Sequence, residues 1–143
     1  MTDGRAIVAS GWIANALFAA TALPAALTRD DVLVAAAIGT ALLLFFVAIA
    51  AFAYAFSVAV ARSARGDNVA VANLFFLQGS APRAVQRAFL GVFLACLAIA
   101  AATAAWEPFG VLVPMLPIGL TGVWAARYGA FPPRPPAPVR RRV

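Results

Sequence analysis

Four long apolar stretches, separated by short polar segments, make up most of the chain. They cover residues 7–27, 32–60, 88–105 and 108–126. An α-helix rises 1.5 Å per residue and the hydrocarbon core of a bilayer is roughly 30 Å thick, so about 20 apolar residues can cross it. The pattern therefore predicts an all-α polytopic membrane protein with four transmembrane helices. The second stretch exceeds the length a perpendicular helix needs, so we expect it to tilt or to extend past the membrane surface.

The connections between these stretches differ greatly in length. Residues 28–31 join the first two stretches, and only Trp106 and Glu107 separate the last two. Helices joined by such short turns pack as antiparallel neighbours, so the sequence predicts two antiparallel hairpins. The connection 61–87 links the hairpins. Residues 1–130 then form one transmembrane domain, and the Pro/Arg-rich tail 131–143 is predicted to be extended and disordered.

The arginines are distributed unequally between the two sides of such a bundle. Ten of the eleven lie at the termini or in the connection 61–87, and only Arg29 lies in a turn on the other side. By the positive-inside rule, both termini and the connection are predicted to be cytoplasmic, in a multi-pass protein of the plasma (inner) membrane. The acids Asp30, Asp31 and Glu107 then fall in the outward-facing turns. Trp12, Trp106, Trp124 and Tyr128 lie near span ends, where amphipathic rings favour the headgroup level.

The first stretch has a second interpretation as a cleaved signal peptide. Arg5 would be its basic region, and Ala20-Thr21-Ala22 would be a small-residue cleavage site. The apolar stretch is longer than the usual 7 to 15 residues or so, and Asp3 weakens the basic start, so a retained span is favoured. The later spans keep their orientation under either interpretation.

Small residues indicate where helices approach closely in lipid. Ala51, Ala55 and Ala59 recur at spacing four in the second stretch. Helix association in a bilayer depends on close approach at such positions. Because alanine is abundant throughout the chain, we expect Gly11 and Gly91 to mark the closest contacts.

The connection 61–87 contains the main candidate contact surface. Its apolar segment 69–77 is too short to span, so we expect it to lie at the interface or under the bundle. Ser80 precedes Ala81 and Pro82, which suits an N-cap and a helix that starts at about Ala81. The predicted contact residues for a protein partner or anionic lipid are Leu74, Phe75, Phe76, Arg83 and Arg87, with Arg140, Arg141 and Arg142 in the tail. Simple anchoring by anionic headgroups is the alternative role for these arginines.

Two intramembrane features favour transport as an alternative function. Asn15 is the one strongly polar side chain deep in a span, and Pro114 and Pro117 predict a kinked or broken fourth span. Broken helices can expose backbone groups at a binding site. However, no acid or base is predicted at mid-membrane, where proton-coupled transport usually needs one. Asn15 is then an interhelical hydrogen-bonding residue.

The composition excludes several classes of function. The chain is 64% hydrophobic and has a net charge of +6, with no histidine and a single cysteine, Cys96. Without histidine there is no catalytic histidine, bis-histidine haem or usual zinc site, and one cysteine excludes a CxxC redox pair. The arginines flank apolar spans, so nucleic-acid binding is not indicated. We expect no enzyme activity, no cofactor and no metal.

The residues GSAPRAVQRAFLG (79–91) and FGVLVPMLPIGLTGVWAARYGAFPPR (109–134) resemble segments of uncharacterised small, alanine-rich four-span membrane proteins of high-GC actinobacteria. This resemblance implies a membrane protein and no particular activity. Size and span count are similar to those of small multidrug-resistance transporters. Those proteins depend on a glutamate in the first span, where this chain has only Asn15.

The sequence therefore predicts a non-enzymatic accessory or scaffold subunit of a larger membrane complex. Its connection and tail would contact a membrane-protein partner or anionic lipid. The alternative is a small oligomeric transporter or channel, with a site near Asn15 and the broken fourth span.

Overall fold

A computed structural model describes residues 3–135, and Arg140, Arg141 and Arg142 lie outside this range. Its elements are α1 (Asp3–Thr28), α2 (Asp31–Ala64), the short α3 (Val71–Phe75), α4 (Arg83–Thr103), the 3₁₀ helix η1 (Pro108–Leu112) and α5 (Met115–Tyr128). Four segments are long and apolar enough to cross a membrane: Gly4–Thr28, Asp31–Ala64, Arg83–Thr103 and Pro108–Tyr128. The prediction of an all-helical membrane protein is confirmed at this level.

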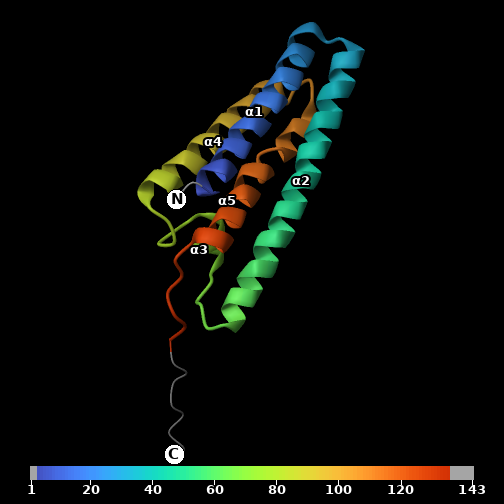
Figure 1. Cartoon of the computed structure of the whole chain (residues 1–143). Helices are drawn as coiled ribbons and strands as arrows, with labels where there is room; N and C mark the ends of the chain where they lie inside the picture. The colour runs from blue at the N-terminus through green and yellow to red at the C-terminus, as the bar shows by residue number, and fades with distance from the viewer. Residues whose placement is uncertain (1–2, 136–143) are drawn as a thin grey trace, which may run out of the picture.

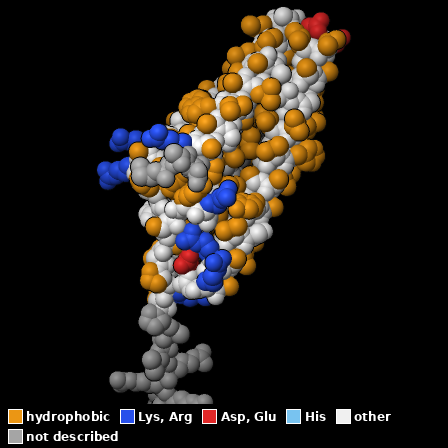
Figure 2. Space-filling view, in the orientation of Figure 1, with side chains coloured by type: hydrophobic (Ala, Val, Ile, Leu, Met, Phe, Trp, Pro, Cys, Tyr) orange, Lys and Arg blue, Asp and Glu red, His pale blue; other side chains and the backbone are white. Residues whose placement is uncertain are grey.

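The four long segments lie side by side, and α1 and α2 run in opposite directions from a shared turn (Figure 1). Apolar side chains cover the length of the bundle (Figure 2). Basic side chains gather where α3 lies, which we call the basic end, and an acidic side chain lies among them (Figure 2). Acidic side chains also lie at the opposite tip, where α1 meets α2. At that tip the Asp30 side chain accepts hydrogen bonds from the N–H groups of Val32 and Leu33, so it caps α2.

The fourth segment is the most buried of the four, and its largest interface is with α2 rather than with α4, which precedes it in the chain. On the α2 side the interface is a row of buried alanines that includes Ala51, Ala55 and Ala59. On the α5 side, a Cβ at Gly119 would lie 3.1 Å from the Ala51 Cβ. Small side chains on both helices therefore let the two backbones approach closely, as packing in lipid requires.

The glycines expected to mark close contacts behave differently from one another. A Cβ at Gly11 would lie 2.8 Å from Val92 Cγ1, so the close approach of α1 to α4 depends on this glycine. A Cβ at Gly91 would meet only Trp12 Cζ2, at an ordinary 3.8 Å. The prediction holds for Gly11 and is wrong for Gly91. Trp124, expected near a span end, lies beside Gly4 at the start of α1 and is buried in the core.

The predicted break in the fourth span is present, and the proline backbone explains it. Pro117 has no N–H to donate to the Val113 carbonyl, which instead accepts a hydrogen bond of 2.9 Å from Leu116 N–H. The 3₁₀ turns of η1 end there, and α5 begins at Met115 with Pro114 as its N-cap. Pro117 lies in the first turn of α5, where a missing donor costs little.

The start of α4 differs from the sequence expectation. The helix begins at Arg83, with Pro82 rather than Ser80 at the N-cap position. The Ser80 hydroxyl donates to the Asn73 carbonyl instead, so it ties α3 to the segment before α4. Ser80 therefore bonds to the preceding helix α3 and does not cap α4.

The packing of α5 makes Gly122 intolerant of a side chain. A Cβ there would lie 2.5 Å from Phe75 Cε1 and 3.1 Å from the Ala55 Cβ. We expect Gly122→Leu to lower the free energy of unfolding by about 1–3 kcal/mol through overpacking, measured by thermal unfolding in detergent. Gly39→Leu is the matched control, because nothing lies within 4 Å of a Cβ at Gly39. Equal unfolding temperatures for the two variants would contradict this packing.

Candidate functional site

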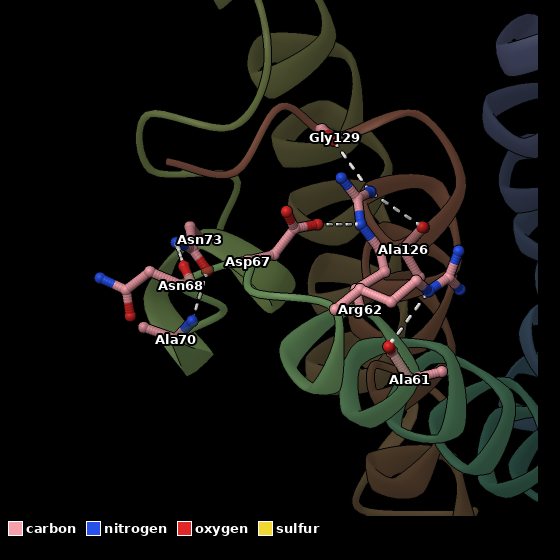
Figure 3. A network of polar contacts seen from close by, with 9 residues as sticks. Ala61, Arg62, Asp67, Asn68, Ala70, Asn73, Ala126 and Gly129 are labelled. Atoms are coloured by element: carbon pink, nitrogen blue, oxygen red, sulfur yellow. Dashed lines mark hydrogen bonds and ion pairs between the residues drawn. The ribbon is translucent and has the colours of Figure 1, made fainter. Parts of the chain in front are cut away.

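Arg62, in the last turn of α2, organises the basic end (Figure 3). Its Nε lies 2.8 Å from Asp67 Oδ2, and its Nη1 donates to the carbonyls of Ala126 and Gly129 at 3.2 and 3.0 Å. These carbonyls are at the C-terminal end of α5, where the last turn leaves backbone acceptors unpaired and the helix dipole favours a cation. The guanidinium also lies 4.5 Å from the ring centroid of Phe131. One side chain therefore joins the ends of α2 and α5.

Backbone hydrogen bonds extend this junction to the segment after α5. Asn68 N–H donates to the Pro132 carbonyl at 2.8 Å, and Arg134 N–H donates to the Gly66 carbonyl at 2.8 Å. Ala130 N–H donates to the Ser80 carbonyl at 3.0 Å. Pro132 and Arg134, in the tail predicted to be disordered from Phe131, thus bond to the connection through their backbone groups. We call residues 62–80 together with 129–135 the platform.

An open, polar hollow of about 510 Å³ lies between the platform and the last turn of α5. Arg62, Arg65 and Arg127 line it together with Asp67 and Tyr128. Arg62 and Asp67 form an ion pair with each other, whereas Arg65 and Arg127 are exposed to solvent. The hollow therefore carries a positive charge suited to an acidic group on a partner.

The predicted contact residues of the connection divide between interior and surface. Leu74 is buried with Trp124 and Ala125 of α5, so it cannot contact a partner. Phe75 is half-buried, and its ring lies 4.9 Å from that of Phe52. Phe76 is 61% exposed. The predicted surface is therefore smaller than the sequence suggested, because α3 turns Leu74 towards α5.

Phe76 also forms one wall of an apolar groove between α3, α4 and α5. The groove has a volume of about 210 Å³. Its walls are mainly aromatic and aliphatic, and the lining residues are Phe75, Phe76, Leu77, Gln86, Phe89, Leu90, Phe93, Ile118 and Thr121. Arg83 and Arg87 are exposed on the first two turns of α4, beside this groove.

Asn15 lies inside the bundle and bonds to a neighbouring helix. Its side chain is 5% exposed, and Nδ2 donates to the Val92 carbonyl of α4 at 2.9 Å. Neither of the two hollows described for residues 3–135 is lined by Asn15. The residue therefore joins α1 to α4, a role that the lone polar side chain in an apolar span correctly indicated.

Glu107 lies in the turn between α4 and η1, as expected, but its side chain is turned into the protein. It is 0% exposed, and both carboxyl oxygens lack a hydrogen-bond partner among the described residues. A Cβ at Gly110 would lie 2.6 Å from Glu107 Oε2, so this glycine makes room for the carboxyl group. Burial raises the pKa of Glu107, and the nearby N–H groups of Gly110 and Phe109 offset this only in part. The neighbouring Trp106 is exposed and stacks under the Arg29 guanidinium at 3.8 Å.

No cluster of three or more metal-ligating His, Cys, Asp or Glu side chains occurs within residues 3–135. Comparisons with protein-family models, curated proteins and solved structures found no match for this chain. Any functional conclusion therefore depends on the geometry of the chain itself.

The hydrogen bonds of Arg62 should stabilise the platform. We expect Arg62→Met to speed amide hydrogen exchange at Asn68 and Arg134 by about tenfold, because hydrogen bonds to charged groups contribute about 1.5–3 kcal/mol. Exchange detected by mass spectrometry would measure this. The control is Arg65→Met, since the described bond of Arg65 is to Ala61 of its own helix. Unchanged protection in Arg62→Met would show that the platform does not depend on Arg62.

The buried carboxyl group of Glu107 makes stability depend on pH. Because its pKa is raised in the folded state, the folded protein binds the proton more tightly than the unfolded chain does. Stability should be highest below the ordinary glutamate pKa of about 4.3 and should fall as the pH rises through the folded-state pKa. We expect Glu107→Gln to flatten the profile of unfolding temperature against pH, whereas Asp31→Asn, at an exposed acid, retains it. Parallel profiles for wild type and Glu107→Gln would contradict the assignment.

Proposed function

We propose that the chain is a non-enzymatic accessory or scaffold subunit of a larger complex in the plasma membrane. Both termini, the connection 61–87 and the platform face the cytoplasm in this proposal. The arginine distribution supports the orientation, since basic residues are retained on the cytoplasmic side. Asp30 and Asp31, at the opposite tip, then face outward.

The single observation that carries the proposal is the joining of the connection and the tail into one surface. These segments are far apart in sequence, yet Arg62 and the backbone bonds at Asn68 and Arg134 hold them together. Transmembrane anchoring alone needs only basic residues near the span ends, with no fixed arrangement. A defined surface with exposed arginines instead supports recognition of an acidic partner.

The interior supports the scaffold role over a transport path at Asn15. A path would need the Asn15 amide to face a cavity, and this amide is bonded to the Val92 carbonyl inside a packed interface. The break in the fourth span also lies in the core, because Val113 and Leu116 are buried beside Phe18. Neither Asn15 nor the break at Pro114 and Pro117 lines either of the two hollows described above.

One observation favours the alternative of a small oligomeric transporter, and it concerns Glu107. Its buried carboxyl group lies directly before the broken span, and buried acids are the groups that carry protons in coupled transport. In this alternative, Glu107 carries the proton, and the transport site lies beside it rather than at Asn15.

The proposed subunit role predicts a partner that depends on the platform. Tagged protein is purified from its native membrane in mild detergent, and stoichiometric proteins are identified by mass spectrometry. We expect Arg65→Gln/Arg127→Gln to reduce the retained partner by about tenfold, because two interfacial charges contribute on the order of 1 kcal/mol each or less. The matched control, Arg83→Gln/Arg87→Gln, removes the same charge outside the hollow and should retain the partner.

Two outcomes would overturn the subunit role. One is equal partner recovery from both double variants. The other is a homo-oligomer without a partner that moves protons in proteoliposomes and stops doing so in Glu107→Gln. The second result would establish the transporter alternative.

A further inference from the structure

The geometry points to a binding site for one anionic phospholipid at the α3–α4–α5 groove, with an acyl chain in the groove and the phosphate on Arg83 and Arg87. This inference deepens the proposed function by separating the lipid contact from the partner contact. It takes one point from the proposed function, namely that the basic end faces a leaflet that contains anionic lipid.

The groove is chemically suited to an acyl chain because its polar lining groups are already bonded within the protein. Gln86 Nε2 donates to the carbonyls of Leu77 and Ala81 at 3.1 and 2.9 Å, and Thr121 Oγ1 donates to the Pro117 carbonyl at 2.8 Å. These groups offer little to a polar ligand. The remaining walls are apolar, so the ligand portion that fills the groove gains by leaving water.

The wall formed by α3 and Leu77 is fixed rather than loosely placed. Leu77 has a left-handed backbone conformation with φ of 56°, which an L residue adopts at an energetic cost. Its side chain is buried, and its carbonyl accepts the bond from Gln86, so both interactions hold this conformation. The groove is therefore preformed.

The size of the groove selects an acyl chain over a partner helix. A helix with its side chains is roughly 10 Å across, whereas the hollow is about 210 Å³. The most exposed lining side chains are Phe76 at 61% and Leu90 at 53%, so the groove opens between them on the flank of the bundle. In the proposed membrane orientation, that flank faces the surrounding lipid.

Arg83 and Arg87 supply the complementary charge. They lie four residues apart on α4, on the same face as the groove residue Leu90. Neither forms an ion pair with a described side chain, since the pair found in residues 3–135 joins Arg62 to Asp67. Guanidinium groups donate to phosphate oxygens in a bidentate manner. Figure 2 shows basic side chains over the start of α4, next to the apolar flank.

The test uses the purified full chain in mixed micelles that contain equal amounts of dioleoylphosphatidylglycerol and dioleoylphosphatidylcholine. Native mass spectrometry counts the lipids retained by each chain and identifies them. We expect one phosphatidylglycerol per chain, retained with a preference of about tenfold or more over phosphatidylcholine.

Two pairs of variants separate the groove from the charges. Leu90→Trp fills the mouth of the groove and should abolish retention, whereas Leu94→Trp changes a residue of similar exposure, 51%, outside the groove and should not. Arg83→Gln/Arg87→Gln should remove the headgroup preference, whereas Arg5→Gln/Arg127→Gln, with the same charge change, should keep it. As a measurement that needs no substitution, phosphatidylglycerol with a photoreactive acyl chain should label peptides from α3, α4 and α5.

Equal retention by Leu90→Trp and Leu94→Trp, or equal preference in the two arginine double variants, would overturn the site. Labelling spread evenly over all four spans would do the same, since it indicates general annular lipid. The lipid site and the hollow at Arg65 and Arg127 are separate. A failed lipid test therefore does not affect the proposed partner contact, which is tested by the Arg65→Gln/Arg127→Gln variant.

Discussion

The close approach of α5 to α2 is the contact on which the rest of the structure depends. In lipid, apolar side chains gain little by leaving one apolar environment for another, so helices associate through tight contact of small residues. The alanine row of α2 and the glycines of α5 provide that contact. With α5 held there, α1 and α4 pack around it, and the end of α5 comes within reach of Arg62.

The platform follows from the same geometry. Because α2 has 34 residues, it is about 51 Å long and extends past a hydrocarbon core of roughly 30 Å. Its last turns can therefore approach the end of α5 and the segment after it. Within the platform, Arg62 satisfies the carbonyls of Ala126 and Gly129 at the end of α5.

Glu107, unlike Arg62, is a buried acidic residue without a hydrogen-bond partner for its side chain among the described residues. The 3₁₀ turn of η1 and the missing side chain at Gly110 bring its carboxyl group inward against Phe18. A neutral, protonated acid is the form such an environment favours. The scaffold and transporter alternatives differ in whether this proton ever moves.

The sequence by itself determined the class of protein, the four spans, the break at Pro114 and Pro117, and the close contact at Gly11. These features depend on the length of each apolar stretch, on the N–H group that proline lacks and on the side chain that glycine lacks. Each of these can be read from a few neighbouring residues. Only the tertiary structure decided that α5 packs chiefly on α2, that Ser80 bonds to Asn73, and that Glu107 and Leu74 point inward. It also decided that residues 131–135 join the connection through Arg62. Most of these features depend on contacts between residues far apart in the chain, and the Ser80–Asn73 bond depends on the fold of the segment between α3 and α4. Apolar periodicity and charge counts encode neither.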